Sequence, residues 1–143
     1  MIVVRVIMLI TLGLLATITD MYGRYISNRL TGAGVVIGLV ASIIADGKGG
    51  LIKSIAGIII PVMLLGILFF LHLLGAGDIK LLCAVGSIAG IYAVFKIFVA
   101  ALFAGSVIGI FKYINPRNRE NRHVIGFALP IFIGIILYCG GLI

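Results

Sequence analysis

The sequence predicts an all-α, polytopic membrane protein with about six transmembrane helices. Of its 143 residues, 63% are hydrophobic and only 10% are charged, and the mean hydropathy is +1.37. A soluble domain of this size would lack the polar residues needed to cover so much apolar surface. The apolar residues also fall into runs long enough to cross a bilayer, with short polar gaps between them. We therefore expect a single membrane-embedded domain over residues 1–143.

The first three apolar runs cover residues 2–19, 30–45 and 52–74. The first run reaches Asp20 without a clear small-residue cleavage site, which favours a membrane helix over a signal peptide. Glycines in the second run predict close packing between helices in lipid. Residues 46–50, DGKGG, form a turn by composition. Pro61, inside the third run, is tolerated in a membrane helix as a kink.

After a polar gap at residues 75–80, apolar sequence continues from 81 to 114, which is too long for one span of about 20 residues. We place a tight hairpin at residues 90–96, where Gly90, Tyr92 and Lys96 interrupt the run. A polar loop at 115–123 then separates this region from the last run, 124–143.

Basic residues in the gaps predict the orientation. The first, third and fifth gaps hold the larger share, so the positive-inside rule places them in the cytoplasm and both termini outside. These gaps contain Arg24, Arg29, Lys80, Lys112, Arg117, Arg119 and Arg122, whereas the other side holds Arg5, Lys48, Lys53 and Lys96.

Composition argues against several other functions. The net charge of +7 comes from gap residues that form no continuous basic face with interleaved aromatics, so we expect no nucleic-acid partner. The two cysteines, Cys83 and Cys139, form no CxxC pair and have no metal-ligand spacing with His72 or His123. We expect no metal and no cofactor, and both cysteines read as small buried side chains.

Acidic residues are scarce: Asp20, Asp46, Asp78 and Glu120 are all of them. Asp20 closes the first predicted helix and Asp78 opens the fourth, so both are expected at the cytoplasmic boundary. Asp46 and Glu120 are most simply solvated surface charges. Two carboxylates in contact cannot readily both ionise, so one can activate water while the other protonates a leaving amine. The pair predicts aspartic-protease chemistry, although a coupled pair does not reveal which member is the base.

Other interpretations of the same residues stay open. Asp78 can simply cap the next helix, and intramembrane acids also serve ion or proton paths in transporters. A transport path would need polar groups at mid-span, and these are few. Lys80 either favours ionisation of the aspartate pair or anchors its helix at the membrane interface. Arg24 and Asn28 either shape the loop beside Asp20 or belong to a solvated turn.

Two motifs resemble a known family. Residues 75–82, GAGDIKLL, resemble the G-x-G-D-x-K-L-L signature of the type IV prepilin peptidases, which are GxGD aspartic proteases. Residues 20–31, DMYGRYISNRLT, are similar to that family's other motif, in which an aspartate ends the first helix and Ile-Pro-Asn-x-Leu-Thr follows. Ser27 stands where the family usually has proline, and serine can also initiate a turn.

The chain has no methyltransferase insertion with paired cysteines of the kind found in larger family members. It resembles the small members linked to tight-adherence (Flp-type) pili, or the archaeal preflagellin peptidases. This resemblance implies a plasma-membrane enzyme that acts among membrane lipids and removes a short basic leader from type IV pilin-like precursors at the cytoplasmic boundary. Gly75 and Gly77 would let the backbone near Asp78 approach an extended substrate. The alternative is a small transporter, or a non-catalytic pilus assembly factor that only binds precursors.

Overall fold

The computed structural model describes residues 2–23, 27–70, 75–114 and 127–142. These residues form five helices and no strand, which confirms the predicted all-α class. The helices are α1 (Ile2–Gly23), α2 (Asn28–Phe70), α3 (Ala76–Ala89), α4 (Ile91–Ile114) and α5 (Ala128–Cys139). Three windows in these ranges are long and apolar enough to cross a membrane: Ile2–Tyr22, Asn28–Met63 and Ile91–Phe111. The helix α5 is apolar but shorter.

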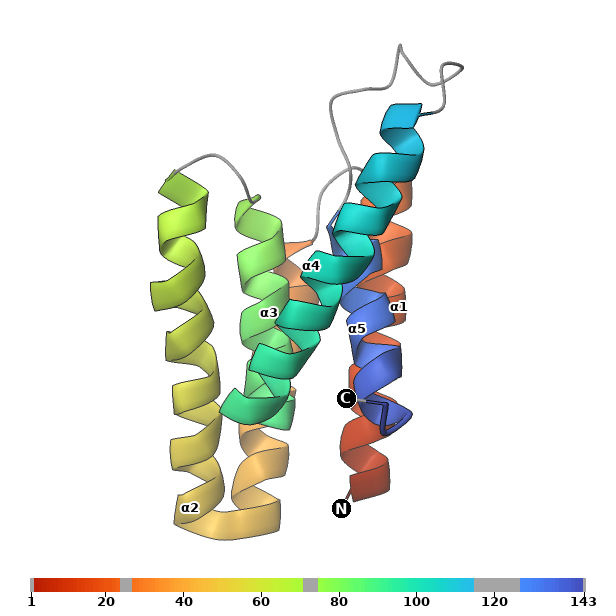
Figure 1. Ribbon diagram of the computed structural model, residues 1–143. Helices are drawn as coiled ribbons and strands as arrows, with labels where there is room; N and C mark the ends of the chain where they lie inside the picture. The colour runs from red at the N-terminus through yellow and green to blue at the C-terminus, as the bar shows by residue number, and fades with distance from the viewer. Residues whose placement is uncertain (1, 24–26, 71–74, 115–126, 143) are drawn as a thin grey trace.

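Helix α2 folds back on itself at Gly47, as the glycine-rich turn predicts. Gly47 has a φ of 58°, which glycine adopts at no steric cost. The turn gives α2 two arms that run side by side, so the described residues form six helical segments in one bundle (Figure 1). Helices α3 and α5, with 14 and 12 residues, are shorter than the hydrocarbon core, since their lengths are about 21 and 18 Å. The number of complete membrane spans stays a prediction.

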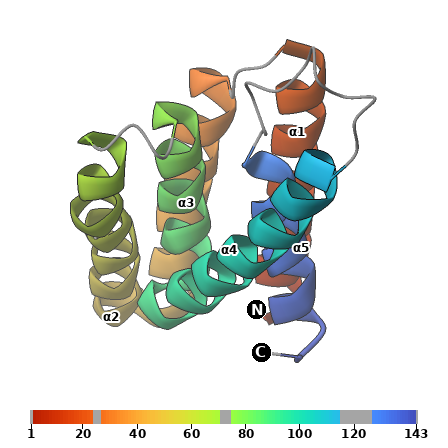
Figure 2. The ribbon, with the colours of Figure 1, turned by 45° about the horizontal axis from the view of Figure 1, so that its top comes forward.

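The two ends of the bundle carry different parts of the chain. Asp20 near the end of α1 and Asp78 near the start of α3 lie at one end, which we call the aspartate end (Figure 1). The Gly47 turn, the junction of α3 and α4, and both termini lie at the other, the Gly47 end. Turning the molecule shows α4 running obliquely from the start near α3 toward α1 and α5 (Figure 2). This alternation follows from the predicted order of runs and gaps.

Helix α3 is the centre of the packing. Every residue from Leu81 to Ile88 is buried, and α3 packs most extensively against the two arms of α2. Small residues make this approach possible: a Cβ atom on Gly34 would lie 3.1 Å from the Cβ of Ala84. Because lipid is as apolar as these side chains, close van der Waals packing and hydrogen bonds must hold the helices together.

Hydrogen bonds from serine side chains join the same helices. The hydroxyls of Ser42 and Ser54, from the two arms of α2, donate to the carbonyl oxygen of Ser87 at 3.3 and 2.6 Å. The Ser87 hydroxyl donates to the carbonyl of Ala84 at 2.8 Å. All three serines are buried, so these bonds satisfy polar groups that would be costly to leave unpaired. These bonds fix the buried part of α3 between the two arms of α2, and the start of α3 continues from this firmly packed segment.

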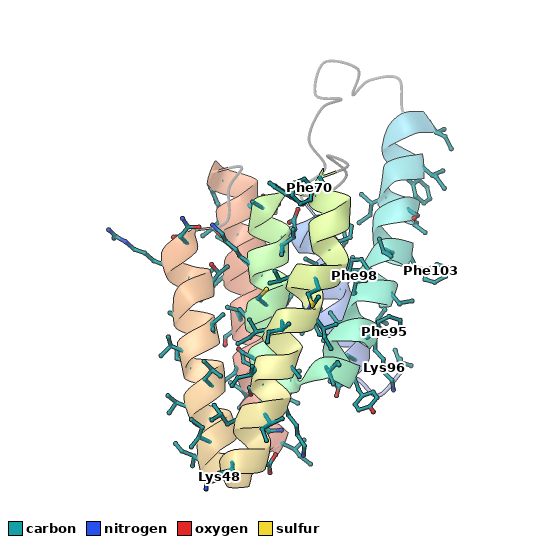
Figure 3. All side chains as sticks on the ribbon, turned by 90° about the vertical axis from the view of Figure 1, so that its left-hand side faces the viewer. Lys48, Phe70, Phe95, Lys96, Phe98 and Phe103 are labelled. Carbon is teal, nitrogen blue, oxygen red and sulfur yellow. The ribbon has the colours of Figure 1, made fainter. Side chains whose placement is uncertain are left out.

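Exposed aromatic side chains mark the surface that faces away from the bundle. Phe95 and Phe103 of α4 point outward, whereas Phe98 of the same helix is buried against its neighbours (Figure 3). Large apolar side chains are also exposed along α1 and α2. A soluble monomer rarely exposes so much contiguous apolar surface, whereas a helix bundle in lipid does. The structure thus supports an integral membrane protein.

Both predicted boundaries of α3 were wrong. The hairpin at residues 90–96 is a single residue, Gly90, whose φ of 82° reverses the chain, and Tyr92 and Lys96 already belong to α4. The polar gap at residues 75–80 is mostly helical, because α3 begins at Ala76. In both places polar or small residues were interpreted as loop, although glycine needs only one position to turn the chain and polar residues are favoured in a first helical turn.

An ion-pair cluster at the Gly47 end connects α1 to the α2 turn. The Asp46 carboxylate lies 3.2 Å from the Arg5 guanidinium and 3.9 Å from the Lys53 ammonium. Asp46 is therefore a paired surface charge. We expect Asp46→Asn to lower the free energy of unfolding by no more than about 1 kcal/mol, because exposed ion pairs contribute little. Thermal unfolding in detergent would measure this, and a loss several times larger would contradict the assignment.

Candidate active site

Asp20 lies in the last turn of α1, not at its end. The helix continues to Gly23, about one turn beyond the predicted boundary, so the carboxylate projects from helical backbone and is half-buried. The preceding threonines support this continuation: the Thr17 and Thr19 hydroxyls donate to the carbonyls of Gly13 and Leu15 four residues back. Asp20 is thereby held by a regular helix.

Asp78 lies in the first turn of α3, where it caps the helix. Its carboxylate accepts a hydrogen bond from the Gly75 backbone N–H at 3.3 Å, and the Asp78 N–H donates to the Gly75 carbonyl at 3.1 Å. A carboxylate here also interacts favourably with the positive end of the helix dipole. The capping interpretation of Asp78 is thus correct as structure, and it fixes where the carboxylate lies.

The fold brings the two aspartates to the same end of the bundle. Helix α1 packs against α3, and the carboxylate of Asp20 lies near enough for its charge to act on Asp78. Between the described parts of α1 and α3, no hydrogen bond joins the two carboxylates. Asp78 is half-buried, so water can reach the pair from the aspartate end. Carboxylates within hydrogen-bond reach of a water molecule can exchange protons with it.

The two motif glycines differ from what their sequence suggests. Gly75 has extended backbone angles, φ −76° and ψ 148°, and Gly77 lies within α3, so neither needs the left-handed conformation. What Gly75 provides is space: a Cβ atom there would lie 3.2 Å from the Asp78 carboxylate oxygen. Glycine at this position keeps one side of the Asp78 carboxylate open.

Lys80 pairs with Asn28 across the helices. Its ammonium donates to the Asn28 side-chain carbonyl at 2.9 Å, which joins the start of α2 to the start of α3. Positions 78 and 80 project to different sides of a helix, so Lys80 does not face Asp78. The pairing was not predicted, although both residues belong to the two motifs. Arg24 lies outside the described residues, as do His72, Glu120 and His123.

No three His, Cys, Asp or Glu side chains of the described ranges come together as a group that could hold a metal ion. Cys83 is buried in α3 and Cys139 is half-buried at the end of α5, both as free thiols.

These features define a class of protein: a helical integral membrane protein with two carboxylates at one end of its bundle. Comparison with known families is consistent with this class, because the family model of the type IV leader peptidase family matches residues 7–110. This match covers most of the chain and includes both aspartates, so the chain belongs to the type IV leader peptidase family. Comparisons with curated proteins and with solved structures gave no significant match.

Proposed function

We propose that the protein is an aspartic endopeptidase that removes the short basic leader of type IV pilin-like or preflagellin precursors. The observation that carries this proposal is the location of Asp20 and Asp78 on two packed helices at one end of the bundle, where the Asp20 charge acts on Asp78. The family supports a protease that processes type IV leaders. The proposal also includes a two-aspartate mechanism and an orientation in the membrane.

The chemistry follows from a carboxylate pair that holds one proton. The ionised member takes a proton from water as the water oxygen attacks the scissile carbonyl, and the protonated member stabilises the developing oxyanion. The tetrahedral intermediate then collapses with protonation of the amine nitrogen. The products are a leader with a new carboxylate and a precursor helix with a new amino terminus. No covalent enzyme intermediate is formed.

The half-buried position of Asp20 and Asp78 suits this reaction. A leader sequence is extended and aqueous, whereas the helix that follows it lies in lipid, so the cut must occur where these environments meet. Cleavage of a precursor reconstituted with the protein in liposomes tests the proposal. We expect one cut between leader and helix, read from the new amino terminus by mass spectrometry. Intact precursor after prolonged incubation with folded protein would contradict it.

The space beside Asp78 gives a second test. Gly75→Ala places a methyl group 3.2 Å from the Asp78 carboxylate oxygen, which must then shift by a few tenths of an ångström. Because small misplacements of catalytic groups are costly, we expect kcat to fall about tenfold while the unfolding temperature is unchanged. Gly66→Ala is the matched control, since nothing lies within 4 Å of a Cβ atom there. Equal cleavage activity of both variants would show that the space at Gly75 is not needed for catalysis.

We further propose that the aspartate end faces the cytoplasm. The larger share of basic residues in the gaps at this end supports that orientation. Exposed residues at the two ends allow a direct test: Arg29 begins α2 at the aspartate end, and Lys48 lies at the Gly47 turn. In a chain with both native cysteines replaced by alanine, we expect a membrane-impermeant maleimide to label Lys48→Cys in intact cells and Arg29→Cys only after permeabilisation. The reverse labelling pattern would show that the aspartate end faces outward.

A further inference from the structure

A groove runs between the first arm of α2 and α3, on the side of α3 away from Asp78. Its volume is about 240 Å³. The lining residues are Asn28, Thr31, Gly32 and Val35 of α2, and Lys80 and Cys83 of α3. The α2 residues follow a helical spacing of three or four, so they form one face of that arm. The start of α3 lies beside the upper part of this arm (Figure 3).

The mouth of the groove is cationic and rich in hydrogen-bond donors. Lys80 uses one of its three N–H donors on Asn28, and the Asn28 amide nitrogen keeps its own two donors. The ion pairs of the described ranges belong to Asp46 at the other end, and Lys80 forms none with a described carboxylate. Lys80 and Asn28 are both exposed. This arrangement is complementary to a group with several anionic oxygens, such as a phosphate.

Below the mouth, the groove is apolar and narrow. Val35 and Cys83 form its walls, and Gly32 leaves open space, since nothing lies within 4 Å of a Cβ atom there. The neighbouring Val36 and Ile37 are 60% and 50% exposed, so the groove opens onto the surface that faces lipid. Its apolar lining and its opening toward lipid suit an acyl chain.

We propose that this groove binds an anionic phospholipid, with its phosphate held by Lys80 and Asn28 and one acyl chain lying along Gly32, Val35 and Cys83. Basic pockets between membrane helices on the cytoplasmic side bind anionic headgroups in the same way. The bound lipid would link the start of α2 to the start of α3, the helix that carries Asp78. This proposal is independent of the peptidase activity.

Native mass spectrometry of the purified protein in mixed micelles tests it, with phosphatidylglycerol and phosphatidylcholine of equal chain length as probes. We expect the wild type to bind phosphatidylglycerol about five- to tenfold more tightly, as one lysine near an anionic headgroup would give. Lys80→Gln should remove this preference and leave the two lipids equal. Gly32→Leu should fill the groove and abolish retention of both lipids.

Matched controls separate the groove from the rest of the lipid-facing surface. Gly66→Leu introduces the same side chain on the second arm of α2, where a Cβ atom also meets nothing, and should retain the lipid preference. Lys96→Gln removes an exposed lysine of α4 at the Gly47 end and should also retain it. Unchanged phosphatidylglycerol binding by Lys80→Gln and Gly32→Leu would overturn the proposal. So would a Gly32→Leu variant that binds lipid normally but fails to cleave precursor, because a peptide would then occupy the groove.

Discussion

Asp20→Asn and Asp78→Asn are each expected to reduce precursor cleavage about a thousand-fold, within the range that positioned acid–base groups contribute. Each substitution removes one ionisable oxygen and leaves an amide of nearly the same size. The remaining carboxylate can act as acid or base but not as both in one turnover. The measurement is the initial rate of leader removal in liposomes, with the product identified by its new amino terminus.

Asparagine is a suitable replacement at position 78 because the capping role can survive it. The Asp78 carboxylate accepts a hydrogen bond from the Gly75 N–H, and an amide oxygen can accept the same bond. The variant therefore separates chemistry from helix stability, which an alanine would not. We expect the circular dichroism spectrum and unfolding temperature of Asp78→Asn to stay close to those of the wild type.

Asp46→Asn is the matched control for both variants. It makes the same chemical change at an acid whose partners, Arg5 and Lys53, lie at the opposite end of the bundle. Its cleavage rate should stay within about twofold of the wild type, since exposed ion pairs contribute little. If Asp20→Asn or Asp78→Asn kept more than a tenth of wild-type activity, the two-aspartate mechanism would be wrong. If neither the two variants nor the wild type processed precursor, the peptidase proposal would give way to a transporter or a non-catalytic binding protein.

Gly86→Ala is expected to give the largest loss of stability. A Cβ atom at Gly86 would lie 2.7 Å from the carbonyl carbon of Gly57 and closer still to its oxygen. The atoms in the way are backbone on two packed helices, so no side chain can rotate to make room. Overpacking of this kind costs about 3 kcal/mol, which corresponds to a fall in unfolding temperature of about 10 °C for a chain of this size.

The same variant should lose cleavage activity, because separation of α3 from α2 displaces the helix that carries Asp78. Gly66→Ala tests whether added methyl groups on α2 are harmful in general. That position is open, so the variant should be neutral or more stable by up to about 1 kcal/mol through its better helix propensity. A Gly86→Ala protein that unfolds at the wild-type temperature would show that α2 and α3 are not in backbone contact.

The fold was largely predictable from sequence because the membrane restricts the choices. Apolar runs of span length give helices, and glycine-rich DGKGG gives the turn at Gly47. The exact residues at which helices begin and end were harder to predict from sequence. Gly90 turns the chain alone, and nothing in its neighbours distinguishes it from Gly86, which lies inside α3. That difference depends on tertiary packing, since Gly86 meets Gly57 of another helix.

The candidate site was predictable in part. The alternation of apolar runs and polar gaps was enough to place Asp20 and Asp78 at one end. An even number of predicted helices separates the two residues, so the chain returns to the same side of the membrane. The partners of the supporting residues were not predictable. Lys80 was expected to act on the aspartates or at the interface. Instead it contacts Asn28 from within α3, which begins five residues earlier than the gap suggested. The direction of a side chain depends on helix phase, which no local composition gives.

Helix α3 has no side that faces lipid between Leu81 and Ile88. This segment therefore does not need apolar side chains for contact with lipid, whereas a helix at the bundle surface must remain apolar. Its tolerance to sequence change should follow side-chain volume: Ala, Ser and Cys should exchange freely at Ala84, and Leu should not. The most enclosed helix is also the least apolar of the five. In this protein apolar side chains therefore occupy both the core and the outer surface, and the buried serine hydroxyls lie where the two arms of α2 meet α3.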